Sequence, residues 1–144
     1  MQYGVLPYRF TEDAALEILL VTTRRTRRWI VPKGWPIRGL RPAESAAREA
    51  FEEAGIRGII GGKPLGVFTY DKVPDEAGVN TTCEVKVYPL LVKQQSEVWP
   101  ESEQRMTQWV WPSKAVVLIK EPGLRKIVTL FTKRVAAVAS RSIF

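Results

Sequence analysis

The residues from Gly34 to Ile56, GWPIRGLRPAESAAREAFEEAGI, constrain the fold more than any other part of the chain. Their second half predicts a helix over residues 42–54. Pro42 suits the first helical position, and Gly55 suits the stop after the last turn. At ~100° per residue, alanines and Phe51 gather on one side of this helix, and the charged residues take the other side. The charged side holds Glu44, Arg48, Glu49, Glu52 and Glu53.

Two carboxylates on the charged side, Glu49 and Glu53, are one turn apart and lie about 40° from each other on the helical wheel. Like charges at this spacing destabilise a helix by ~0.2–0.5 kcal/mol. A divalent cation between them would remove that cost, because hard cations take carboxylate oxygens as ligands. Ion pairs of Arg48 with Glu44 or Glu52 would instead make this side an ordinary solvated surface. The pattern alone leaves both interpretations open.

The composition of the chain limits its domain number, its compartment and the kinds of catalysis that it can perform. The 144 residues predict one domain over residues 1–144. The single cysteine, Cys83, excludes internal disulfides and fits a reducing, cytoplasmic compartment. Histidine is absent, so Ser-His-Asp catalysis and His-ligated zinc are excluded. No apolar run is long enough to span a membrane. A net charge of +7 favours anionic ligands.

Short apolar runs predict strands over residues 3–10, 16–23, 29–32, 66–70, 83–92 and 108–111. Helical patterns follow over residues 112–119 and 124–139, and the apolar face of the second predicts docking on the sheet. Pro7 and Pro89 favour edge strands or bulges, since proline lacks a backbone donor. The glycine-rich segment Gly58–Gly62 predicts a turn. The polar loop over residues 71–82 is either a substrate lid or disordered.

The stretch from Gly34 to Ile56 resembles the Nudix box, G-x5-E-x7-R-E-U-x-E-E-x-G-U, where U is a bulky aliphatic residue. The matching positions are Gly34, Arg48, Glu49, Glu52, Glu53, Gly55 and Ile56. Two positions differ, since Leu40 replaces a glutamate and Ala50 is smaller than the usual aliphatic residue. The resemblance implies an α/β fold, the Nudix α/β/α sandwich, with a mixed β-sheet between helices.

The same resemblance implies a Nudix-type pyrophosphohydrolase, which hydrolyses a phosphoanhydride bond with Mg²⁺, or alternatively Mn²⁺. Glu49 and Glu53 would bind the metal, and the carbonyl of Gly34 is a possible further ligand. Glu52 is the predicted base that takes the proton from the attacking water. Arg48 would orient the glutamates by ion pairing. Leu40 is not in the carboxylate cluster, so we expect metal binding to survive this substitution.

Four arginines between Arg24 and Arg28 form either a solvated loop or a phosphate cradle, since guanidinium groups bind phosphate in a bidentate way. Within the Nudix group, the order of segments resembles diphosphoinositol polyphosphate phosphohydrolases. This implies that Arg24 and Arg28 contact substrate phosphates, and Lys33 adds charge beside the box. A small-molecule polyphosphate is therefore expected, either a diphosphoinositol polyphosphate or a dinucleoside polyphosphate.

Other residues and functions stay open. A loop between residues 94 and 104 often supplies another carboxylate in Nudix proteins, and Glu97, Glu101 and Glu103 are equal candidates here. A non-catalytic nucleotide-sensing module is a second possible function, opposed by the retained carboxylate cluster. A basic nucleic-acid-binding domain is a third, opposed by few aromatic residues among the arginines. The sequence does not predict the oligomeric state.

Overall fold

The computed structural model describes residues 1–142, with side chains through Ala139. The elements in chain order are β1 (Gln2–Phe10), β2 (Leu16–Thr22), β3 (Trp29–Ile30), β4 (Lys33–Gly34), α1 (Pro42–Ala54), β5 (Ile56–Ile60), β6 (Gly66–Asp71), β7 (Thr82–Gln95), β8 (Thr107–Val110), α2 (Pro112–Leu118) and α3 (Pro122–Ser142). Of the predicted strand over residues 29–32, only Trp29–Ile30 forms a strand, β3, which pairs with β2. The chain then crosses to pair with β1 through β4 at Lys33–Gly34, which lies beyond the predicted strand.

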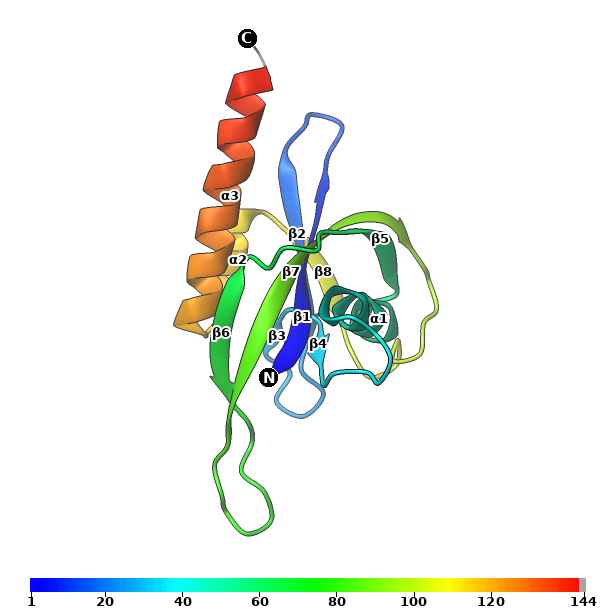
Figure 1. The fold of residues 1–144 in the computed structure, drawn as a ribbon, viewed down its shortest axis with the longest axis vertical. Coiled ribbons are helices and arrows are strands. Elements are labelled where there is room, and N and C mark those ends of the chain that lie inside the picture. Colours follow the sequence, from blue (N-terminus) through cyan, green and yellow to red (C-terminus); the bar gives the residue numbers. More distant parts are fainter. Residues whose placement is uncertain (143–144) are drawn as a thin grey trace.

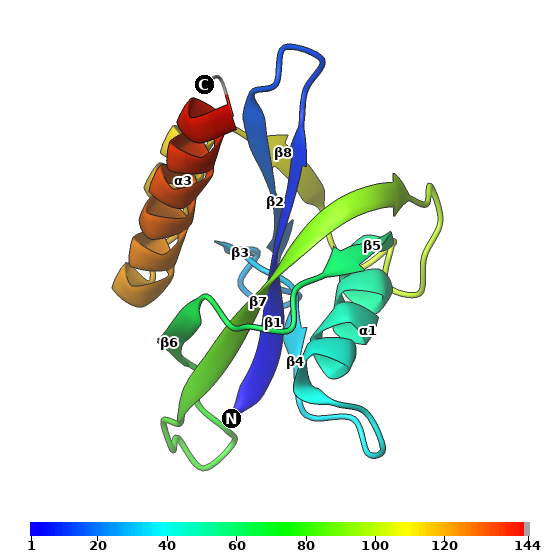
Figure 2. The same cartoon turned by 45° about the horizontal axis from the view of Figure 1, so that its top comes forward.

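The strands form one mixed sheet with the order β3-β2-β1-β7-β5, and β4, β6 and β8 pair with β1, β7 and β2. Strands β1 and β7 run parallel, and the other pairs are antiparallel. Helix α1 lies on one side of the sheet and α3 on the other (Figure 1; Figure 2). The predicted α/β/α sandwich is therefore confirmed.

Each face of the sheet has its own hydrophobic core, and neighbouring residues on a strand alternate between the two. Val5 and Leu19 pack under α1 with Ala46 and Ala50. Leu6 and Leu20 point the other way, into the core that Ile127 and Phe131 of α3 complete. Successive strand side chains point to opposite faces, so a strand buried on both faces is apolar at every position. This explains the unbroken apolar run in β2.

Neither Pro7 nor Pro89 lies on an edge strand, so the expectation from sequence is wrong for both. On the flank of β1 away from β7, pairing with β4 ends at Gly4 and pairing with β2 begins at Tyr8. On the far flank of β7, pairing with β6 ends at Val87 and pairing with β5 begins at Leu90. Each proline thus falls between two partner strands, where its missing donor interrupts no ladder on that side.

The turn predicted over Gly58–Gly62 is also wrong in its first half, because residues 56–60 form β5. The register between β5 and β7 shifts between Arg57 and Gly58, which marks a bulge. A Cβ at Gly58 would collide with the carbonyl of Leu91. The glycine therefore permits close strand pairing.

The two predicted C-terminal helices are present as α2 and α3. The buried side of α3 faces the sheet through Leu124, Ile127, Val128 and Phe131. No helix in the described part of the chain combines the length and apolar character that a membrane span requires.

Candidate active site

Helix α1 places the predicted glutamates beside β4. The helix begins at Pro42 and ends before Gly55, which adopts a left-handed conformation with φ of 69°. The backbone N–H of Gly55 donates to the carbonyl of Phe51 over 2.9 Å. The sequence placed Glu53 on the open side of the helix, but the structure buries it with Ala50 and Ala54. The buried side of α1 therefore includes Glu53 in addition to the alanines.

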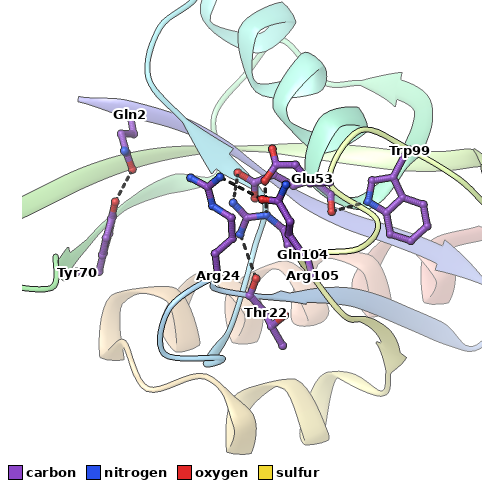
Figure 3. Close-up of polar contacts among 9 residues, drawn as sticks. Gln2, Thr22, Arg24, Glu53, Tyr70, Trp99, Gln104 and Arg105 are labelled. Atoms are coloured by element: carbon purple, nitrogen blue, oxygen red, sulfur yellow. Dashed lines mark hydrogen bonds and ion pairs between the residues drawn. The ribbon is translucent and has the colours of Figure 1, made fainter.

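The loop over residues 96–104 explains this burial, because it closes over the end of α1. Ser96 donates its N–H to the carbonyl of Gly55 over 2.8 Å, and Glu101 donates to the carbonyl of Glu52 over 3.1 Å. The indole of Trp99 donates to the carbonyl of Glu53 over 2.9 Å (Figure 3). The last carbonyls of a helix have no partner within it, so the loop satisfies groups that α1 cannot.

This docking brings Glu101 and Arg105 to the glutamates of α1. The guanidinium of Arg105 lies between Glu101, at 2.8 Å, and Glu53, at 3.5 Å. It also donates to the carbonyl of Thr22 over 3.0 Å (Figure 3). Of the three loop glutamates left open by the sequence, Glu97 and Glu103 are exposed, and Glu101 joins the cluster.

Glu49 lies directly against Gly34 of β4. A Cβ built at Gly34 would stand 2.6 Å from Oε2 of Glu49, closer than real Cβ contacts come. A glycine at this position is therefore required for the observed place of the Glu49 carboxylate. The first glycine of the motif and the glutamate that follows its arginine, 15 positions apart in sequence, are in contact.

Burial and mutual repulsion perturb these acids. Burial, followed by the nearby Arg105 and Lys33 charges that oppose it, sets the pKa of Glu53 at about 7, and Glu101 and Glu49 add to the rise. The pKa of Glu49 is also raised, first by burial and then by Glu52 and Glu101. Burial lowers the pKa of Lys33, although Glu53 opposes this shift. Arg105 and Lys33 therefore do not offset the cost of ionising all of these buried carboxylates, since the pKa values of Glu49 and Glu53 stay raised beside them.

The residues fit a hard divalent cation in their chemistry. Glu49, Glu53 and Glu101 offer oxygen ligands, and the pKa values of Glu49 and Glu53 are raised first by burial and then by neighbouring carboxylates. Within residues 1–142, no three acidic or cysteine side chains converge as a finished metal site, because Arg105 separates Glu53 from Glu101. Metal binding at this cluster would require those side chains to move.

The other predicted residues of α1 divide between its two sides. Glu52 neighbours Glu49 and contributes to its raised pKa. Arg48 is exposed and makes no ion pair with any residue in the described range, so the expected pairing with the glutamates is absent. Arg48 and Leu40 line a separate hollow of about 400 Å³ between α1 and β5. Leu40 thus lies apart from the carboxylates, as its motif position implied.

The predicted substrate-binding residues meet in one cleft. Arg24, Arg28 and Lys33 line a hollow of about 310 Å³ with Tyr70 and Arg105. Arg24 is exposed and donates to Gln104 over 3.3 Å. The ammonium of Lys33 lies 4.3 Å from the ring centre of Tyr70. Basic groups therefore approach the carboxylate cluster from the side of β3 and β6.

Arg28 has a partner that the sequence did not indicate. Its guanidinium is 2.6 Å from Oε2 of Glu121, at the start of α3. The motif likewise gave no signal for Arg105, since it lies 52 residues after Glu53. Contacts between residues this far apart in the sequence depend on how the sheet and loops bring the segments together.

Comparison with known proteins agrees with this geometry. The NUDIX domain profile matches residues 3–131. The chain is 34% identical over 135 residues to Nudix hydrolase 21, chloroplastic, of Arabidopsis thaliana, covering 91% of this chain and 65% of that protein. It is 32% identical over 114 residues to diphosphoinositol polyphosphate phosphohydrolase 3-alpha of Homo sapiens, covering 77% of this chain and 65% of that protein. The chain thus spans slightly less than two thirds of either relative.

Solved structures share the fold. A C. elegans Ap4A hydrolase binary complex aligns with a TM-score of 0.69 at 19% identity, covering 94% of this chain and 97% of that one. The NUDIX domain of Shewanella oneidensis NrtR, complexed with ADP ribose, aligns with a TM-score of 0.65 at 14% identity, covering 92% and 86%. The profile match over most of the chain shows that this chain belongs to the Nudix hydrolase family, as the motif resemblance implied.

Proposed function

We propose that the chain hydrolyses a phosphoanhydride bond in a small-molecule polyphosphate, and that it requires a divalent cation, Mg²⁺ or alternatively Mn²⁺. One observation carries the proposal. Glu53 and Glu101 are paired with Arg105, which lines one cleft together with Arg24 and Lys33. Glu49 lies close enough to Glu53 and Glu101 to feel their charge. Metal-binding acids beside phosphate-binding cations are the two parts that phosphoanhydride cleavage needs.

In this proposal Glu49 and Glu53 hold the cation, with Glu101 and the carbonyl of Gly34 as further oxygen ligands. A bound cation supplies neutralising charge for the phosphate oxygens and makes a water easier to deprotonate. Arg105, now paired with two of these acids, would turn toward the substrate phosphates when the cation takes its place.

Glu52 is the proposed base, because it neighbours Glu49 and its own carboxylate has no ion-pair partner in the described range. It would take the proton from the attacking water while the acids on either side keep the metal. Arg48 was predicted to orient the glutamates, but it lines the separate hollow on the other side of α1.

Arg24, Arg28 and Lys33 are proposed to bind the peripheral phosphates of the substrate. Lys33 lies deepest, with its ammonium against Tyr70. Arg24 is exposed at the rim. Arg28 is already half-neutralised by Glu121, so it would contribute less attraction than the other two. Substrate phosphates would then line up from the rim toward the carboxylates.

The test is a product screen with purified protein over dinucleoside polyphosphates and diphosphoinositol polyphosphates, each with Mg²⁺, with Mn²⁺ and with chelator. Turnover that requires the cation supports the proposal. Glu52→Gln should lower turnover by ~10²-fold or more, whereas Glu44→Gln, a change to an exposed glutamate on the same helix, should not. Tight nucleotide binding without turnover under any condition would favour a sensing module instead.

Two further predictions accompany this proposal. A single Nudix domain over residues 1–144 is one, supported by a sheet to which both helical layers contribute core residues. A cytoplasmic location is the other, supported by the single free cysteine, Cys83. Relatives named as chloroplastic or mitochondrial mean that targeting must be measured, for instance by imaging of a tagged protein.

A further inference from the structure

A second hollow continues the cleft away from the carboxylates. It has a volume of about 500 Å³ and shares Thr26, Arg28 and residues 70–73 with the hollow beside Arg105. The shared walls make the two one cleft with a near end, at the carboxylates, and a far end, at the start of α3. A substrate held at the near end would extend into the far end.

The two ends differ in charge. Six basic residues and one acidic residue line the near end. Three basic residues and two acidic residues, Asp71 and Glu121, line the far end. Attraction for anions is therefore concentrated near the carboxylate cluster and weak at the start of α3.

Glu121 gives the far end its particular chemistry. Its side chain is only 7% exposed, and Oε2 is paired with Arg28 at 2.6 Å. Its other oxygen, Oε1, is enclosed and has no hydrogen-bond partner among the described residues. A buried acceptor without a partner loses its hydration and gains nothing in return, so such groups in a binding wall point to a ligand that satisfies them.

We propose that the far end of the cleft binds an uncharged part of the substrate that donates a hydrogen bond to Glu121, such as a nucleoside amino or hydroxyl group. The assignment of this group to a substrate rests on the hydrolase function proposed above. The carboxylate would turn toward the hollow, and Oε1 has no existing hydrogen bond to lose. Arg28 can stay bound through either oxygen.

The same carboxylate repels a phosphate at this position. Arg28, the nearest cation, is already occupied by Glu121. A ligand with phosphates on every side, such as an inositol polyphosphate, would place one of them against this acid. Glu121 therefore selects for a substrate with phosphates at one end and a hydrogen-bond donor at the other, which favours a dinucleoside polyphosphate.

The first test measures adenosine binding by calorimetry, which requires neither a metal nor turnover. Glu121→Gln should weaken adenosine binding about tenfold, because a neutral amide oxygen replaces the charged acceptor and weakens the hydrogen bond. Glu17→Gln is the matched control, because Glu17 is a half-buried acid paired with Arg9 at 2.9 Å outside the cleft. It should leave adenosine binding unchanged. Equal binding by wild type and Glu121→Gln, or no binding by wild type, overturns the proposal.

The second test uses kinetics, and it separates this inference from the hydrolase proposal. For diadenosine tetraphosphate, Glu121→Gln should raise KM about tenfold with little change in kcat. For inorganic tripolyphosphate, which has no donor-bearing end, KM should not rise. A wild type that binds adenosine but hydrolyses neither compound, nor a diphosphoinositol polyphosphate, would overturn the hydrolase function and leave the far-end site standing.

Ligand analogues keep the inference testable if Glu121→Gln does not fold. Purine riboside lacks the amino group of adenosine, and 2′,3′-dideoxyadenosine lacks its 2′- and 3′-hydroxyls, the ribose hydroxyls that stay free in a dinucleoside polyphosphate. At least one should bind wild type about tenfold more weakly than adenosine does. Equal affinity for all three compounds would show that no donor is recognised and would overturn the proposal.

Discussion

Replacing Gly34 by alanine tests whether the place of the Glu49 carboxylate matters for the metal. The added Cβ would stand 2.6 Å from Oε2 of Glu49, whereas ordinary contacts begin at 3.4 Å. The carboxylate must therefore withdraw by at least about 0.8 Å or rotate away, since its Cδ lies closer still to the added Cβ. A flexible side chain can do this without unfolding the protein, so the effect should fall on function rather than on stability.

The expected loss follows from that displacement. Mg²⁺ demands near-ideal geometry, with oxygens at about 2.0–2.1 Å, and a ligand moved by most of an ångström no longer serves. Disturbing the support of a metal ligand lowers metal affinity by about 10–100-fold. We expect Gly34→Ala to raise the Mg²⁺ concentration needed for half-maximal turnover by a similar factor. The free energy of unfolding should change by less than about 1 kcal/mol.

The assay is a Mg²⁺ titration of initial rates, paired with urea unfolding in chelator. Gly62→Ala is the matched control, because a Cβ there meets nothing within 4 Å. This control should keep both the metal requirement and the rate of wild type. If Gly34→Ala binds Mg²⁺ as wild type does, the contact between Gly34 and Glu49 does not set the metal site, and the argument from geometry fails.

Three further predictions concern the acids. Glu52→Gln should lower turnover by ~10²-fold or more while Mg²⁺ binding, followed by calorimetry, is retained; an unchanged rate would remove Glu52 as the base. The raised pKa of Glu53, about 7 against an ordinary 4.5, means that the metal-free folded protein binds a proton that the unfolded chain has released. Its stability in chelator should therefore fall as the pH rises through that interval, and Glu53→Gln should flatten this dependence in urea unfolding between about pH 5 and 8. Glu101→Gln should lower turnover about tenfold or more, whereas Glu103→Gln, an exposed acid in the same loop, should not; equal rates for the two variants would exclude Glu101 from the site.

Local patterns predicted the parts of this fold that local physics determines. The alanines and the Pro42 and Gly55 boundaries define α1 within a residue of the structure. The continuous apolar run in β2 predicted a strand, and the structure explains the run by burial on both faces of the sheet. The strand β5 was missed because Gly58 disfavours a strand in isolation and is explained only by its contact with Leu91.

The candidate site likewise contains residues that the sequence predicted and residues that it did not. The motif spacing identified Glu49, Glu52 and Glu53, which one helix presents together. The pairings of Arg105 with Glu53 and of Arg28 with Glu121 join residues 52 and 93 positions apart, and no periodicity reports them. The sequence therefore indicated the three acids of α1, but it did not indicate Arg105, which pairs with Glu53 and Glu101, nor Glu121 in the wall of the cleft at the start of α3.

Gly55 is constrained twice. It adopts a left-handed φ of 69°, which asparagine also tolerates. A Cβ at this position would, however, lie 2.8 Å from the ring of Trp99, which is hydrogen-bonded to Glu53. Asparagine would thus satisfy the backbone and still push the tryptophan out, carrying Glu101 away from the acids of α1. The final glycine of the motif is in this way a spacer between helix and loop, and its small size governs whether the fourth acid reaches the other three.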